Sequence, residues 1–127
     1  MIDGLFASTN YQGVKKMLDA TVMRHEAIAS NLANIETPHY KRIDLNPSFA
    51  SDLSGAINSQ SRSGVENLRP TVSVDFKALA QNEDGNTVQL EGEMLHLQDN
   101  TLAHQMQTQL ITGALQKLRY AISTRGI

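Results

Sequence analysis

Residues 88–123, VQLEGEMLHLQDNTLAHQMQTQLITGALQKLRYAIS, carry the pattern that decides the fold. Positions in this stretch recur at alternating steps of four and three residues, the spacing of helices that wrap around each other. The pattern predicts one helix over about 88–123, with Asn86 and Gln89 as a candidate start cap. Its members are Leu90, Met94, Leu97, Thr101, His104, Thr108, Ile111, Leu115, Leu118 and Ile122.

A second strip of apolar residues lies beside this pattern on the same predicted helix. It consists of Leu95, Leu102, Met106 and Leu110. A helix in a simple two-helix hairpin needs only one apolar stripe. The second strip therefore either buries the middle of the chain or forms a surface for other subunits, and the pattern favours neither alternative.

A matching pattern near the beginning of the chain predicts a helix over residues 9–36. Thr9 and Gln12 have the spacing of a capping box, and Thr37–Pro38 ends the helix because proline has no backbone N–H. The patterned positions are Tyr11, Val14, Leu18, Thr21, His25, Ile28, Leu32 and Ile35. The two patterns predict a mainly α fold: an elongated, coiled-coil-like antiparallel pair of N- and C-terminal helices within one domain over 1–127.

The middle of the chain, residues 37–86, is irregular by comparison. It predicts a short helix over 47–58, a flexible loop over 59–64, a short strand over 71–76 and a turn over 83–86. No second convincing strand is present in the sequence. The predicted strand therefore has no expected partner within the chain.

Composition excludes several classes of protein. The 127 residues carry 11 Lys and Arg against 13 Asp and Glu, a net charge of −2, which argues against a nucleic-acid binder or a polybasic membrane-surface protein. The chain has no cysteine, so disulfides and thiol chemistry are excluded. Aromatic residues make up only 5% of the chain, too few for an ordinary core. Either the chain folds as a thin helical object, or part of its burial comes from partners.

No targeting segment is evident. Residues 1–6 have no basic region and no long apolar run, so no Sec-type signal peptide is expected. No window approaches the roughly 18 apolar residues that a transmembrane helix requires. Both features suit a cytoplasmic protein, and they equally suit an export route that reads an N-terminus without such a signal.

The sequence offers little chemistry. His25 and His104 both lie on the helical patterns and could meet in an antiparallel pair, but no Asp or Glu at a neighbouring patterned position would complete a metal site. Polar residues that set the pairing between helices are the simpler interpretation. No nucleophile elbow or phosphate-binding loop is present. We therefore expect no enzyme activity, no metal, no cofactor, no nucleic acid and no small-molecule substrate.

The stretch Ala29-Ser-Asn-Leu-Ala-Asn-Ile-Glu-Thr-Pro-His-Tyr-Lys-Arg42 is the most specific motif in the chain. Asn31 and Asn34 share a face near the predicted helix end, where their amides can bond unpaired carbonyl groups. Tyr40 supplies an amphipathic anchor for the segment that follows the turn. An ordinary helix stop would explain Pro38 but not the two asparagines with Tyr-Lys.

This motif closely resembles the N-terminal signature of the bacterial flagellar axial proteins, the rod and hook family. The matching residues are Asn31, Leu32, Ala33, Asn34, Thr37, Pro38, Tyr40 and Lys41. His39 stands where many members of that family carry glycine. The stretch Gly85–Met94, followed by Leu97 and Asn100, resembles the proximal-rod members in particular, and the short chain suits a small rod protein.

The resemblance implies a structural subunit of the flagellar basal-body rod, which assembles helically with other copies and transmits torque for motility. It also implies export by the flagellar type III apparatus into the periplasm without a cleaved signal peptide. The implied partners are other rod subunits, the adapter protein beneath the rod, the membrane ring and the export apparatus. The alternative is a soluble cytoplasmic helical adaptor or regulator that dimerises through its heptads.

On either interpretation, the helix patterns define an assembly seam. The predicted seam residues are Val14, Leu18, Ile28, Leu32, Met94, Leu97, Ile111, Leu115 and Leu118.

Overall fold

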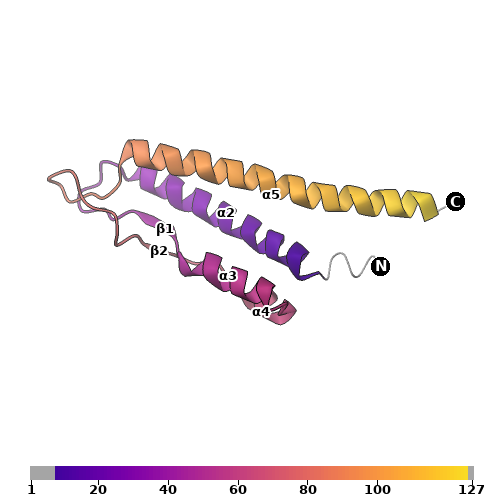
Figure 1. The fold of residues 1–127 in the computed structure, drawn as a ribbon. Coiled ribbons are helices and arrows are strands. Elements are labelled where there is room, and N and C mark those ends of the chain that lie inside the picture. Colours follow the sequence, from indigo (N-terminus) through magenta and orange to yellow (C-terminus); the bar gives the residue numbers. More distant parts are fainter. Residues whose placement is uncertain (1–7, 126–127) are drawn as a thin grey trace.

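The computed structural model describes residues 8–125 and consists mainly of two long helices with a short mixed segment between them (Figure 1). Residues 1–7, on which the signal-peptide expectation rests, lie outside the described part. The elements are α2 (Thr9–Ala33), β1 (Ile43–Leu45), α3 (Ser48–Asn58), α4 (Arg62–Asn67), β2 (Val72–Val74) and α5 (Leu90–Arg125). None of the helices within residues 8–125 is long and apolar enough to cross a membrane.

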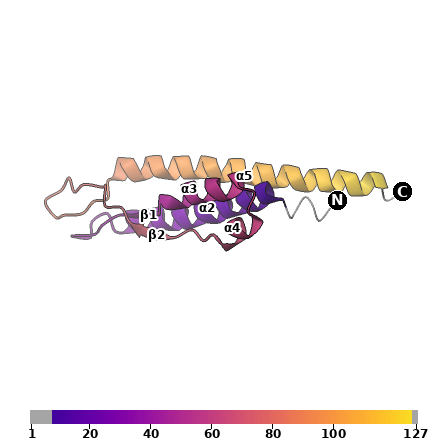
Figure 2. The same cartoon turned by 60° about the horizontal axis from the view of Figure 1, so that its bottom comes forward.

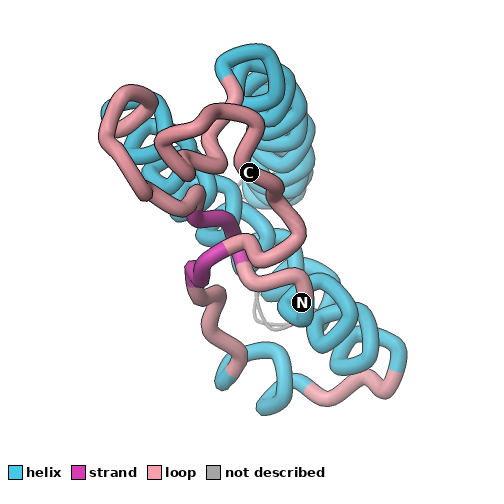
Figure 3. The backbone as a smooth tube through the Cα atoms, turned by 90° about the vertical axis from the view of Figure 1, so that its left-hand side faces the viewer, coloured by secondary structure: helices cyan, strands magenta, loops and turns pink. Residues whose placement is uncertain are grey.

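The two long helices run antiparallel, side by side, as the sequence predicts (Figures 1 and 2). α5 has 36 residues and α2 has 25, so α5 continues past the beginning of α2. The short helices α3 and α4 and the two strands pack mainly on α2. The strands form only a small part of the backbone (Figure 3).

Both ends of α2 differ from the sequence-based boundaries. The N-cap is Ser8, whose Oγ accepts a hydrogen bond of 3.1 Å from the backbone N–H of Tyr11, so the predicted cap at Thr9 is wrong by one residue. The helix ends at Ala33, three residues before the predicted end. Asn34 closes it, since its own backbone N–H bonds the carbonyls of Ser30 and Asn31.

The middle segment contains one strand and one helix that the sequence pattern misses. The expected strand is present as β2, but β1 pairs with it antiparallel, with Asp44 opposite Ser73, so the expectation of an unpaired strand is wrong. The expected loop over 59–64 is also partly wrong. Ser61 caps the short helix α4 by accepting a hydrogen bond from the Gly64 N–H. The helix expected over 47–58 is confirmed as α3.

The apolar core of the described residues is small and lies between α2, α3 and α4. It consists of Ala20, Phe49, Leu53 and Val65, with Leu45, Ala56, Ile57 and Leu68 packed against them. The contact between α2 and α5 is instead rich in buried polar side chains, including Thr21, Asn31, Glu93, Asn100 and Gln107. The interior therefore has an apolar part and a polar part.

The face of α5 that meets α2 is not the one that the apolar pattern predicts. The buried residues on this face are Glu93, Asn100 and Gln107, at steps of seven. Successive residues on a helix are about 100° apart, so Met94 lies to one side of this face and is 43% exposed. Leu115 is 45% exposed. Within the subunit, the predicted seam is therefore wrong at Met94 and Leu115.

The remaining seam residues lie closer to the helix contact. Ile28 is fully buried, and the others are half-buried: Val14, Leu18, Leu32, Leu97, Ile111 and Leu118. A role of these residues in assembly between subunits stays a prediction.

Candidate functional site

The motif residue Asn31 lies in the last turns of α2 and is fully buried. Its Nδ2 donates to the backbone carbonyl of Ile43 at 2.8 Å, and its Oδ1 accepts from the Ile43 N–H at 2.9 Å. The side-chain amide therefore pairs with β1 as a neighbouring strand would. The same Nδ2 also donates to Oε2 of Glu93 on α5 at 3.2 Å, so one side chain joins α2, β1 and α5.

The other motif residues organise the turn after α2. Asn34 Nδ2 donates to the Ser30 carbonyl at 2.8 Å, and the Tyr40 hydroxyl donates to Asn31 Oδ1 at 3.3 Å. The expectation that both asparagines bond carbonyls at the helix end is thus confirmed for Asn34. It is wrong for Asn31, which bonds the strand.

Left-handed backbone at His39 explains why glycine suits this motif position. The φ angle of His39 is +63°, in the region that residues with a Cβ rarely adopt. Its N–H donates to the Asp84 carbonyl at 2.9 Å, and Lys41 Nζ donates to the Gly85 carbonyl at 2.8 Å. These bonds hold the motif against the turn that leads to α5.

The prediction of Asn86 as the start cap of the last helix is wrong, because α5 begins at Leu90, four residues further on. Asn86 has another role. Its Nδ2 donates to the carbonyls of Asn34, Ile35 and Thr37 at 2.8–3.1 Å. These carbonyls follow the end of α2 and have no partner from a continuing helix. Asn86 Oδ1 also accepts from the Val88 N–H at 2.7 Å, so one side chain fastens the end of α2 to the segment before α5.

A buried ion cluster lies next to Asn31. Arg42 Nε donates to Glu93 Oε1 at 2.6 Å, Nη1 to Asp75 Oδ2 at 2.6 Å, and Nη2 to Asp44 Oδ2 at 3.2 Å. Arg42 and Glu93 are both almost fully buried. We refer to Asn31, Arg42, Asp44, Asp75 and Glu93 as the polar joint, because they connect α2, both strands and α5.

The charged groups of the polar joint stabilise each other's ionised forms, as the shifted pKa values of Arg42 and Asp44 indicate. Burial alone lowers the pKa of Arg42, but hydrogen bonds to Glu93 and Asp75 and the charges of Glu93 and Asp44 outweigh it, so the pKa is raised above its ordinary value. Burial alone raises the pKa of Asp44. Hydrogen bonds from Arg24 and the Leu45 N–H and the two guanidinium charges outweigh it, so the pKa of Asp44 lies below its ordinary range.

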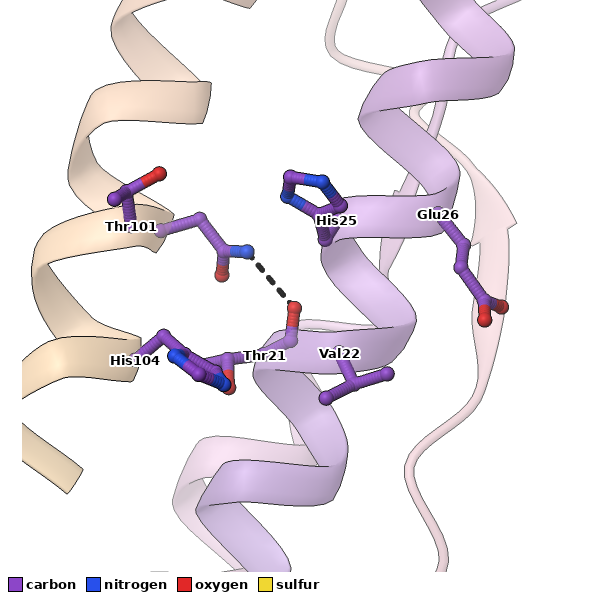
Figure 4. Close-up of a pocket in the computed structure, with 7 residues that line it drawn as sticks. Thr21, Val22, His25, Glu26, Thr101 and His104 are labelled. Carbon is purple, nitrogen blue, oxygen red and sulfur yellow. Dashed lines mark hydrogen bonds between the residues drawn. The ribbon is translucent and has the colours of Figure 1, made fainter. Parts of the chain in front are cut away.

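A second polar contact between the long helices is centred on Thr21 (Figure 4). Asn100 Nδ2 donates to the Thr21 carbonyl at 2.8 Å, and Thr21 Oγ1 donates to Gln107 Oε1 at 3.1 Å. Beside it lies an open groove of about 370 Å³, into which His25 and His104 face from the two helices. Among residues 8–125, no group of three or more His, Asp or Glu side chains is placed to hold a metal ion.

The second strip on α5 is open to solvent. Leu95, Leu102 and Met106 are each 58% exposed and Leu110 is 62% exposed. The middle segment packs mainly on α2 rather than on this strip. Of the two alternatives for the strip, burial of the middle segment is therefore wrong, and a surface for other subunits remains.

These features define a class of protein: an elongated helical subunit whose polar joint fixes a helix pair and whose long helix presents apolar side chains outward. No family model matches the chain. The flagellar basal body rod protein FlgB of Aquifex aeolicus (strain VF5) is 33% identical over 113 residues, 87% of this chain and 90% of the relative. FlgB of Salmonella typhimurium is 30% identical over 84% of this chain and 86% of the relative. FlgB of Escherichia coli (strain K12) is 26% identical, covering 91% and 93%.

The chain therefore belongs to the FlgB family of flagellar basal body rod proteins.

Proposed function

We propose that this chain is a structural subunit of the flagellar basal body rod, in its proximal part, and that residues 1–127 act as one rod-type domain. The observation that carries the proposal is the second strip, a row of exposed leucine and methionine side chains on α5 with the rest of the subunit packed elsewhere. The FlgB relatives match over nearly the whole chain, which supports a rod role for the whole subunit.

The strip suits assembly for a physical reason. Burying apolar surface stabilises a contact by about 25 cal/mol per Å², and exposed apolar rows of this kind mark sites of protein association. A contact between two different faces of neighbouring copies does not close on itself and continues as an open helix of subunits. Such an assembly forms a shaft that can transmit torque.

The partners in this proposal are other rod subunits, the adapter protein beneath the rod, the membrane ring and the export apparatus. The subunit leaves the cytoplasm through the flagellar type III apparatus without a cleaved signal peptide. Its place is then the rod of the basal body, where the shaft crosses the periplasm.

Two substitutions on α5 test the proposal in cells that lack the native gene. Leu102→Asp places a charge in the second strip, whereas Gln105→Asp places the same charge on an exposed polar position of the same helix. We expect the chain and the Gln105 variant to be present in purified basal bodies and to support swimming, and the Leu102 variant to be lost from both. A chain that is absent from basal bodies and forms a discrete closed dimer in size-exclusion chromatography would favour the adaptor alternative.

A further inference from the structure

The most exposed large apolar side chains among residues 8–125 lie in the loop that follows β2. Phe76 is 88% exposed and Leu79 is 75% exposed. The base of this loop is held firmly. Asp75 Oδ1 accepts from the Lys77 N–H at 3.0 Å, and Asp75 Oδ2 accepts from Arg42 of the polar joint at 2.6 Å. These bonds fix the start of the loop, which reduces the entropy that a partner must remove on binding.

An apolar groove lies elsewhere on the same molecule, between α2, α3 and α5. It has a volume of about 280 Å³, and its apolar lining includes Met17, Ala20, Phe49, Leu53, Ile57 and Ala103. Polar side chains, among them Thr21, Arg24 and Asn100, line the rest of it. A phenylalanine side chain that enters such a groove removes about 150–250 Å² from water. Met106 and Leu110 follow Ala103 by three and seven residues, so they continue the apolar surface along the same face of α5.

The loop does not fill the groove of its own copy. Phe76 and Leu79 are not among the residues that line it, and both stay exposed. The loop lies at the end of the molecule where α5 begins, whereas α3 lies beside the other half of α2 (Figures 1 and 2). Phe76 shares a separate pocket with Leu45, at one end of the groove, and does not enter the groove itself. The groove is therefore open to the loop of a different copy.

One charged residue in the loop and one of opposite charge near the groove favour a particular orientation of the loop in the groove. Lys77, between the two exposed apolar residues, is the only Lys or Arg between Arg69 and Lys117. Asp99 is the only Lys, Arg, Asp or Glu between Glu93 and Lys117, and it lies one turn before Ala103 at the edge of the groove. Both side chains are exposed, and neither forms an ion pair with another residue in the described range 8–125.

We propose that the Phe76–Leu79 loop of one copy docks into the apolar groove of a second copy, where Lys77 pairs with Asp99. The contact joins two different surfaces, so it repeats without closing and displaces each copy along the long axis relative to the last. The proposal rests on the proposed rod function, because a repeating contact of this kind requires an open assembly.

The first experiment uses the absence of cysteine in the chain. Leu79→Cys marks the loop and Ala50→Cys marks the groove, and both positions are exposed. The two variants are co-expressed in cells without the native gene, and basal bodies are isolated and treated with a short bis-maleimide reagent. We expect a cross-linked dimer from the mixture and none from either variant alone.

Other results overturn the docking model. A dimer from Leu79→Cys alone would show a symmetric contact, and a cross-link from either cysteine to a different rod protein would show another partner. Basal bodies that contain the chain but give no cross-link would exclude this docking and leave the rod function standing. A chain that is absent from basal bodies would instead contradict the rod function itself.

The second experiment exchanges the two charges in the cysteine background. Lys77→Asp and Asp99→Lys are each expected to lower the cross-linked fraction about two- to fivefold, the range for an exposed ion pair, and the double variant is expected to restore it. Glu91→Lys, an exposed acidic position on the same helix, serves as the matched control and is expected to have no effect. No rescue in the double variant would overturn the pairing.

Discussion

The two ends of the α2–α5 pair carry different side chains: one end is polar and buried, and the other is apolar and exposed. At the polar joint, Arg42 and Glu93 are buried, and no buried side-chain nitrogen or oxygen among the described residues lacks a hydrogen-bond partner. At the far end of α5, Leu110, Tyr120 and Ile122 are apolar and exposed. The polar joint is satisfied by contacts within the subunit, whereas the far end exposes apolar side chains that suit contact with a neighbour.

Removing the central cation is expected to have the largest effect. Arg42→Met leaves three carboxylates of the polar joint without their shared partner, and breaking a buried ion pair in this way costs about 3–5 kcal/mol. Urea unfolding followed by circular dichroism measures the loss. The control is Arg62→Met, since Arg62 and Glu66 form an exposed pair worth at most about 0.5 kcal/mol. Equal effects of the two substitutions would contradict the assigned role of the joint.

Removing the amide that fastens the end of α2 is expected to have the next largest effect. Asn86→Ala removes the side-chain donor that the carbonyls of Asn34, Ile35 and Thr37 share. The Asn34 and Thr37 carbonyls keep the backbone N–H groups of Thr37 and Tyr40, whereas the Ile35 carbonyl depends on Asn86. An acceptor left unsatisfied in this way costs about 1–3 kcal/mol. The midpoint of urea unfolding should fall accordingly. Asn82→Ala, at an exposed position in the same loop, should leave the midpoint unchanged.

Acid is expected to weaken the joint through Asp44. Because its pKa is lowered in the folded state, the stability that it contributes is complete above about pH 4 and is lost as the pH falls through its folded pKa. The raised pKa of Arg42 keeps the guanidinium charged throughout, so no matching loss occurs at high pH. Unfolding free energies measured between pH 3 and 7 should show this slope, and Asp44→Asn should flatten it.

A charge at the far end of α5 is expected to change stability least and assembly most. Leu115→Asp lies at an exposed position, so the unfolding free energy of the free subunit should change by less than about 0.5 kcal/mol. The same charge should remove swimming, because the proposed packing of rod subunits places this position in an interface from which water is excluded. Leu32→Asp, at a half-buried position on α2, should impair both. Normal swimming in both variants would contradict the packing scheme.

The long helices could be predicted from sequence because their patterns repeat over many turns. Which side of α5 faces α2 could not, because that face is centred on Glu93, Asn100 and Gln107, and a pattern of apolar residues does not detect polar contacts. The strand β1 has only three residues, and its partner lies about thirty positions further along the chain. Pairing at such a distance leaves little local signal.

The sequence is enough to identify the motif around Asn31 but not the contacts that Asn31 makes. Its residues stood out because an ordinary helix stop does not require two asparagines followed by Tyr-Lys. What Asn31 bonds depends on β1 and on Glu93, and the fold brings Glu93 to it from 62 positions away. The sequence around the helix end therefore predicts the hydrogen bond of Asn34 correctly and that of Asn31 incorrectly.

The unequal lengths of the two long helices have a mechanical consequence. α5 is 11 residues longer than α2, or about 16 Å at 1.5 Å per residue, and the end of α2 lies level with the start of α5 at the polar joint. In the proposed rod, the part of α5 that extends past α2 is free to contact the next copy. Such contacts would stagger the boundaries between copies along the shaft. Bending the shaft would then strain the helices as well as the contacts between subunits.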